Sequence, residues 1–208
     1  MDGQRIMINE KLFITTGNNI SGISLAVGGL STPIPLGSFD TLVNLELLQL
    51  SYNIGSLPAG IFDKLTTLKT LIFFGNDFSS LPGGIFDSLV NLKELIIKNC
   101  NLTSLPEGIF DKLVNLERIE LSDTNLSSLS DNIFDKLTKL KYICLADNKL
   151  DSLPLSIINC KELEKFYMRC TVFKYIRPQL QQFLKSHLQI ELIKVCIVGG
   201  HGGFFFFD

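Results

Sequence analysis

The sequence predicts an α/β repeat solenoid, in which a curved parallel β-sheet forms the concave side and short 3₁₀, irregular or helical arms form the convex side. Three observations lead to this fold class. One phrase recurs at a fixed interval, as SLPGGIFDSLVNL at residues 80–92 and as SLPEGIFDKLVNL at residues 104–116. Between such phrases, leucine alternates with variable residues, as in a strand with one apolar face. Hydrophobic residues make up 46% of the 208-residue chain, enough for a continuous core.

The composition limits the classes of partner. A chain of this length forms one ordinary domain or one elongated repeat array. The formal net charge is −2 and lysine and arginine form no block, so a nucleic-acid partner, which needs a clustered basic footprint, is not favoured. No run of apolar residues is long enough for a transmembrane helix, so no membrane span is expected.

The amino-terminal residues and the cysteines predict a cytoplasmic location. Asn9, Glu10 and Lys11 interrupt any apolar run of the length that a secretory signal needs. The five cysteines form no C-x-x-C pair, and their odd number argues against a closed disulfide framework. We therefore expect reduced thiols that mostly fill small apolar positions of the core.

The first repeated segment contains a phenylalanine followed by an aspartate. Its phenylalanines recur at intervals of 23 or 24 residues, at Phe39, Phe62, Phe86, Phe110 and Phe134. The preceding prolines keep the same interval, except that Ser130 replaces one of them. This segment is expected to form the outer arm, with isoleucine, phenylalanine and leucine pointing inward, so that the phenylalanines stack as a spine. Gly60, Gly84 and Gly108 are expected where the backbone turns tightly.

The second repeated segment reads L-x-x-L-x-L-x-x-N and is expected to form the strand. Its copies begin at Leu45, Leu68, Leu92, Leu116, Leu140 and Leu163, and a degenerate copy surrounds Leu25. One such unit cannot bury its apolar face, but stacked units share a core. The final asparagine should turn inward and bond the backbone of neighbouring turns. Cys100, Thr124 and Thr171 take its place in three copies, where we expect a weaker ladder.

These two segments resemble the leucine-rich repeat family. In detail, S-L-P-x-G-I-F-D-x-L-x-N-L is similar to the repeats of lamprey-type variable lymphocyte receptors and related recognition proteins. The resemblance extends over residues 22–176 and about seven turns. It implies a non-enzymatic module that recognises a protein through the concave sheet. The cysteine-rich caps of extracellular family members are missing from this sequence, which favours an intracellular protein.

The predicted organisation has four parts. Residues 1–21 form an amino-terminal capping segment, residues 22–176 the leucine-rich repeats, and residues 177–189 a short helix with Pro178 at its start. Residues 190–208 form a terminal strand and a glycine- and phenylalanine-rich tail.

The last part resembles the first strand of a Ras-like GTPase, of the kind found in Roco-like proteins, as it enters the phosphate-binding loop. The loop is degenerate, because phenylalanines stand where it needs glycine, lysine and a hydroxyl. The glycines that remain in it are Gly199, Gly200, Gly202 and Gly203. Three interpretations stay open: a truncated LRR–GTPase, a terminal strand that caps the solenoid, or a glycine-rich anion nest.

No constellation in the sequence predicts catalysis, a metal site or a cofactor. Only two histidines occur, too few for histidine-based metal sites or a Ser/His/Asp triad. Asp63, Asp87 and Asp111 recur because the repeat recurs, and they are expected to cap local turns of the outer arm. We therefore predict neither an enzyme nor a small-molecule substrate.

The outward positions of the strands predict the binding surface. Apolar, aromatic and charged residues at these positions do not serve the core, and aromatics and arginine are enriched at interface hot spots. The predicted partner-binding residues are Ile72, Phe74, Ile96, Lys98, Arg118, Glu120, Tyr142, Tyr167 and Arg169. The sequence thus predicts a protein–protein recognition module, a scaffold or signalling regulator. The alternatives are the sensor arm of an LRR–GTPase and a fragment of a secreted recognition receptor.

Overall fold

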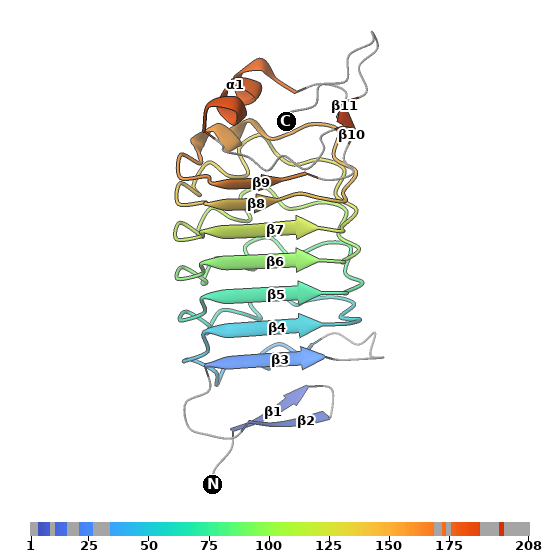
Figure 1. The fold of residues 1–208 in the computed structure, drawn as a ribbon. Coiled ribbons are helices and arrows are strands. Elements are labelled where there is room, and N and C mark those ends of the chain that lie inside the picture. Colours follow the sequence, from blue (N-terminus) through green and yellow to red (C-terminus); the bar gives the residue numbers. More distant parts are fainter. Residues whose placement is uncertain are drawn as a thin grey trace.

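The computed structural model describes residues 4–8, 11–15, 21–26, 34–168, 172–173, 176–187 and 196–197. Its main element is a seven-stranded parallel sheet in which each strand pairs with the next along the chain (Figure 1). The strands are β3 (Gly22–Ala26), β4 (Leu47–Ser51), β5 (Thr70–Phe74), β6 (Glu94–Lys98), β7 (Arg118–Ser122), β8 (Tyr142–Cys144) and β9 (Lys165–Tyr167). The predicted solenoid is confirmed.

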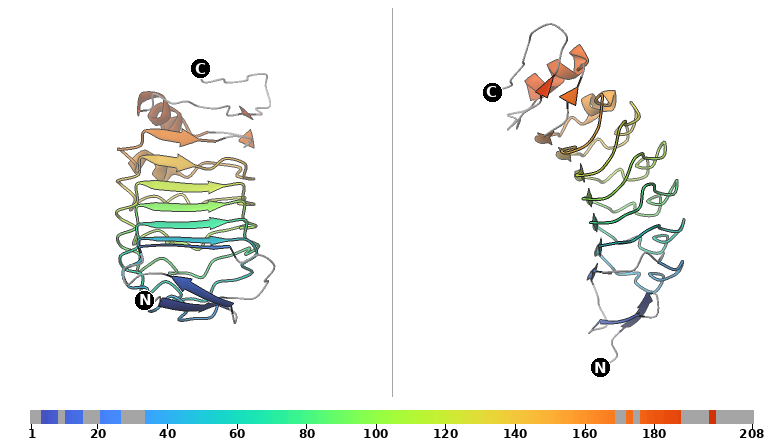
Figure 2. Two further views of the ribbon diagram at one scale, coloured as in Figure 1. Left: turned by 60° about the horizontal axis from the view of Figure 1, so that its bottom comes forward. Right: turned by 90° about the vertical axis from the view of Figure 1, so that its right-hand side faces the viewer.

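The solenoid is curved, and the sheet lies on its inner, concave side. In the right-hand view of Figure 2 the strands line the concave edge of an arc, and the connecting arms form its outer edge. The register advances by one repeat from strand to strand, so that Leu48 pairs with Leu71 and Leu71 with Leu95. Equivalent side chains therefore form rows that run across the sheet.

Shorter elements lie at the two ends of the array. Strands β1 (Gln4–Ile8) and β2 (Lys11–Thr15) form an antiparallel pair, and β10 (Val172–Phe173) pairs in parallel with β11 (Cys196–Ile197). The 3₁₀ helix η1 (Leu155–Asn159) precedes β9, and helix α1 (Pro178–His187) begins at a proline, which the first helical position tolerates. The four glycines of the predicted degenerate loop lie outside the described residues.

The outer arms are runs of tight turns. In the arm before β6, the N–H of Ile85 donates to the carbonyl oxygen of Pro82 at 3.4 Å, and that of Asp87 donates to Gly84 at 3.0 Å. Gly84 has a φ of 69°, in the left-handed region, and Gly60 and Gly108 in the neighbouring arms have φ values of 78° and 66°. These glycines are required because other residues rarely adopt this conformation.

The predicted phenylalanine spine runs through the core between the sheet and the arms. The rings of Phe39, Phe62, Phe86 and Phe110 stack in sequence, with centroids 6.1, 6.5 and 6.3 Å apart. All four are completely buried, and so is Phe134 in the next arm. The rings of Phe62 and Phe86 therefore pack against the turns before and after their own.

A second set of contacts between turns is formed by Asn76 and Asn148, two of the asparagines that end the strand segments. The Asn76 amide is buried; its Nδ2 donates to the Leu50 carbonyl oxygen at 2.9 Å, and its Oδ1 accepts from the N–H of Ile54 at 3.1 Å. Both partners belong to the preceding turn. The amide thus satisfies a backbone donor and a backbone acceptor that water cannot reach.

Two of the substituted positions, Thr124 and Cys100, make different side-chain bonds, and Thr171 lies outside the described residues. The Thr124 hydroxyl still donates to Oδ1 of Asn148 in the next turn. The Cys100 thiol donates at 3.4 Å to the carbonyl oxygen of Lys98, within its own turn. Burial raises the pKa of Cys100 to about 11, although contacts with Asn76 oppose the shift, so the thiol stays protonated and is only a weak donor.

Gly84→Ala is expected to lower the free energy of unfolding by about 1–2 kcal/mol, because alanine resists the left-handed conformation. The added Cβ would also stand 3.1 Å from Oδ2 of Asp87. Gly83→Ala is the matched control, since a Cβ at Gly83 meets nothing within 4 Å. Urea unfolding of the two variants measures the difference, and equal stabilities would contradict the assignment.

Asn76→Ala is expected to destabilise the protein by about 1–3 kcal/mol, because the Ile54 N–H and the Leu50 carbonyl lose a buried partner. The exposed neighbour Asp77 provides the control, and Asp77→Ala should leave the urea midpoint nearly unchanged. Amide hydrogen exchange of Ile54 should also accelerate in Asn76→Ala. Unaltered exchange would show that the asparagine row does not link the turns.

Candidate functional site on the concave sheet

The candidate site lies on the outward face of strands β5 to β9. Seven of the nine predicted residues are half-buried there: Ile72, Phe74, Ile96, Lys98, Arg118, Tyr142 and Tyr167. We call these seven residues the concave strip. Arg169 lies outside the described residues. The strip is continuous because successive strands bring these positions into adjacent rows about 4.8 Å apart.

The end of the strip near β5 is apolar. Ile72 pairs in register with Ile96, and Phe74 pairs with Lys98. The ring of Tyr52, from the turn after β4, meets the Phe74 ring edge-on with centroids 5.7 Å apart. This end therefore presents an apolar surface bordered by one lysine.

Glu120 differs from the expectation that outward positions do not support the fold. Only 8% of this residue is exposed, because neighbouring polar groups surround the carboxylate. Oε2 lies 2.6 Å from Nη2 of Arg118, and Oε1 accepts from the Ser122 hydroxyl at 3.0 Å and lies 3.8 Å from Nζ of Lys98. Removing either cation would leave a buried charge less well compensated. Glu120 therefore positions Lys98 and Arg118.

Arg118 also contacts the aromatic end of the strip. Its Cζ atom lies 3.7 Å from the centroid of the Tyr142 ring, in cation–π geometry. The Tyr142 ring in turn packs against the Tyr167 ring, with centroids 5.1 Å apart. Burial raises the pKa of Tyr142 to about 12, and the charge of Arg118 opposes part of this shift.

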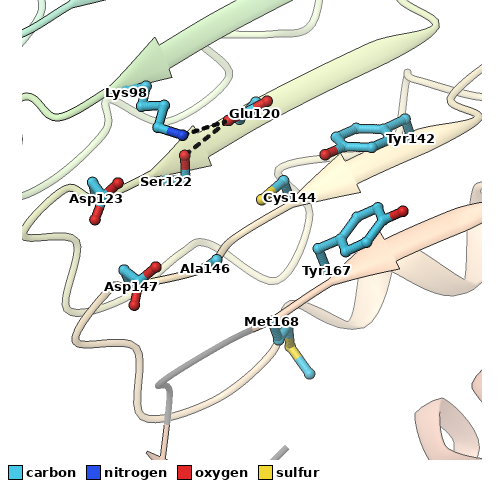
Figure 3. A pocket seen from close by; sticks show the side chains of 10 residues that line it. All are labelled: Lys98, Glu120, Ser122, Asp123, Tyr142, Cys144, Ala146, Asp147, Tyr167 and Met168. Carbon is cyan, nitrogen blue, oxygen red and sulfur yellow. Dashed lines mark hydrogen bonds and ion pairs between the residues drawn. The ribbon is translucent and has the colours of Figure 1, made fainter. Parts of the chain in front are cut away.

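Beside the two tyrosines lies a hollow of about 270 Å³ (Figure 3). Tyr142 and Tyr167 stand at one end, the buried residues Cys144 and Ala146 form the floor between strands, and Asp123 and Asp147 stand at the other end. We call the space between these six residues the β7–β9 hollow. Lys98 and Glu120 border it on the side of β6 and β7 (Figure 3).

The two aspartates are site residues that the sequence analysis missed. They follow strands β7 and β8 and have φ values of 51° and 56°, in the left-handed region that aspartate tolerates. The same place in earlier turns holds Gly75 and Asn99. These four residues occupy one position of the repeat, directly before the position of the repeat asparagine. That position could have been recognised in the sequence as part of the site, because its side chains stand at the rim of the sheet.

The described residues contain no group of three or more His, Cys, Asp or Glu side chains that could hold a metal ion. The aspartates after the phenylalanines serve the outer arms, where Oδ2 of Asp63 and of Asp111 lies 3.0 Å from the place of a Cβ on Gly60 and Gly108. Within the described ranges, no helix has both the length and the apolar character to span a bilayer. The groups described on the concave face are thus a hollow, aromatic rings and charged side chains.

Comparisons with known proteins agree with the fold. The family model described as "Leucine rich repeat" matches residues 66–126, 90–150 and 114–173, which together cover residues 66–173, just over half of the chain. No curated protein matches. These matches concern the repeats in general, so the likeness to lymphocyte receptors and to a GTPase stays a prediction.

Among solved structures, the crystal structure of a TLR13–ssRNA13 complex is 25% identical, with a TM-score of 0.68 over 84% of this chain. The chain spans only 23% of that protein's length. The crystal structure of human 5T4 (Wnt-activated inhibitory factor 1, trophoblast glycoprotein) has a TM-score of 0.67 at 23% identity, covering 82% of this chain and 68% of that one. The likeness to 5T4 shows the fold alone.

The Tyr142 phenol should titrate near pH 12, above its ordinary pKa of 10.0. The unfolded chain releases this proton first, so the contribution of Tyr142 to stability is complete below about pH 10 and declines from there toward pH 12. The difference in phenolate absorbance between the native protein and Tyr142→Phe measures the midpoint, with circular dichroism followed in parallel. A difference midpoint near 10 while the fold persists would contradict the burial of this ring.

Proposed function

The chain belongs to the leucine-rich repeat family, and we propose that it is a non-enzymatic recognition module that binds a protein partner on its concave face. Proteins with this fold are commonly protein-interaction modules, because stacked repeats create an extended concave surface. We further propose that it acts as a scaffold or signalling regulator in the cytoplasm. The free, buried thiols of Cys100, Cys144 and Cys160 support a reducing compartment.

The observation that carries this proposal is the concave strip. Its apolar and aromatic side chains stand at positions that the core does not require, and Arg118 and the tyrosines are of the types that dominate interface energetics. Glu120 holds Lys98 and Arg118, and Arg118 holds Tyr142, before any partner arrives. A surface arranged in advance loses less side-chain entropy on binding, which favours affinity.

The charge of the strip favours a protein over a nucleic acid. The TLR13 structure is a complex with single-stranded RNA, so RNA deserves consideration as a ligand here. In this chain, however, Lys98 and Arg118 are both engaged by the buried Glu120, and the net charge is −2. Phosphate binding needs a row of uncompensated cations, and the described part of this face offers none.

Two other settings for the same surface remain proposals. Similarity to the TLR13 chain, of which this sequence spans 23%, favours a segment of a larger recognition receptor. The glycine-rich sequence after β11 favours the sensor arm of an LRR–GTPase. In both settings the binding surface is still the concave strip.

Replacing Tyr142 and Tyr167 together by alanine should weaken partner binding at least about tenfold, because two aromatic anchors are lost. Thermal stability should change little, since both rings lie outside the core. The measurement is capture from an extract of the source cells with quantitative mass spectrometry, followed by titration calorimetry with the captured partner.

The matched control is Val90→Ala with Val114→Ala, which removes two exposed apolar side chains outside the sheet. This control should capture the same partner in the same amount as the native protein. Equal capture by the tyrosine variant would remove the concave strip from the interface.

A further inference from the structure

We propose that the β7–β9 hollow receives a cationic side chain, an arginine, from the protein partner. This inference rests on the proposed function and adds the chemistry that the partner must carry. It follows from three features of the hollow: the unpaired charge of its two aspartates, the tyrosine rings at one end, and the buried carboxylate that borders it.

The unpaired charge in the hollow is negative. The carboxylates of Asp123 and Asp147 make no hydrogen bond or ion pair with any described residue, and both stand at the rim (Figure 3). The two cations beside Glu120, by contrast, are engaged by its carboxylate, Arg118 at 2.6 Å and Lys98 at 3.8 Å. A cation entering at the aspartate end meets two carboxylates that no positive group among the described residues compensates.

The aromatic end suits the flat guanidinium group and the apolar stem of an arginine. Arg118 occupies a face of Tyr142, and Tyr142 packs against Tyr167, so the exposed part of the half-buried Tyr167 ring is what remains for a ligand. Tyr167 lies opposite Cys144 in the sheet, and Asp147 stands at the other end of the hollow (Figure 3). An arginine lying across Cys144 and Ala146 would cover this apolar floor with its stem. Its two-pronged head suits a pair of carboxylates better than the ammonium of lysine does.

An anionic side chain does not fit the same place. It would face Asp123, Asp147 and the buried Glu120, and the single bordering lysine is already drawn toward Glu120 (Figure 3). Juxtaposed like charges weaken a complex and exclude wrong partners. The hollow therefore selects for a basic residue at one position of the partner.

The test uses the variant Asp123→Asn/Asp147→Asn. Asparagine tolerates the left-handed conformation at both positions, so the fold should persist, and the change removes two negative charges with almost no change in shape. Glu107→Gln/Glu162→Gln removes the same number of charges from exposed positions outside the hollow and serves as the control. Circular dichroism of all three proteins checks that they are folded.

The probe is a displayed library of random linear peptides, selected against the full native chain. We expect the enriched peptides to share an arginine at one position. Changing that arginine to citrulline, which is neutral and nearly isosteric, should weaken binding to the native and control proteins at least about fivefold. The same change should weaken binding to Asp123→Asn/Asp147→Asn less than about twofold, because the carboxylates that recognise the charge are gone.

Other outcomes overturn the inference. An acidic or purely apolar consensus, or an equal citrulline effect in all three proteins, would exclude cation recognition by this hollow. If such peptides still lose affinity in Tyr142→Ala/Tyr167→Ala, the proposed function stands while the inference fails. Failure to enrich any peptide overturns the inference, and the capture experiment then decides separately on the proposed function.

Discussion

Every turn of this solenoid leaves buried groups that only the adjacent turns can satisfy, and the rest of the structure depends on this constraint. Asn76 illustrates it, because its amide bonds a donor and an acceptor of the preceding turn. The phenylalanine spine illustrates the apolar counterpart, since each stacked ring fills space between two arms. A single turn would expose both, so the unit of stability is the pair of neighbours. The fixed interval of 23 or 24 residues in the sequence follows from this need for equivalent contacts.

Because the inward positions satisfy the stack, the outward positions of the strands can vary in sequence and are available for the binding that we propose. The concave strip and the β7–β9 hollow consist mainly of such residues, and they are held by contacts across strands. Glu120 is the centre of these contacts, since it joins Lys98 on β6 to Arg118 on β7, and Arg118 reaches Tyr142 on β8. A rigid framework thus presents an ordered but unfilled surface.

The fold was predictable from the sequence because the same pattern of apolar residues recurs from one repeat unit to the next. Strand positions, the spine and the turn glycines such as Gly84 all follow from periodicity and backbone sterics. The site was predicted less completely. The burial of Glu120 depends on side chains of β6 and β7 that meet only in three dimensions. Asp123 and Asp147 lie past the ends of the strands, in a column whose meaning depends on the left-handed backbone there.

The turn that contains Cys100 has a mechanical consequence. Its thiol donates within its own turn, whereas Asn76 and Asn148 bond the backbone of the turn before theirs. The joint to the preceding turn is therefore held by backbone bonds, such as the one from the N–H of Asn101 to the carbonyl oxygen of Asn76 at 3.0 Å, and by weak contacts of the thiol with Asn76. This joint lies between β5 and β6, inside the apolar end of the concave strip. We therefore expect the curvature of the sheet to change more easily between β5 and β6 than at a joint where an asparagine amide bonds the preceding turn.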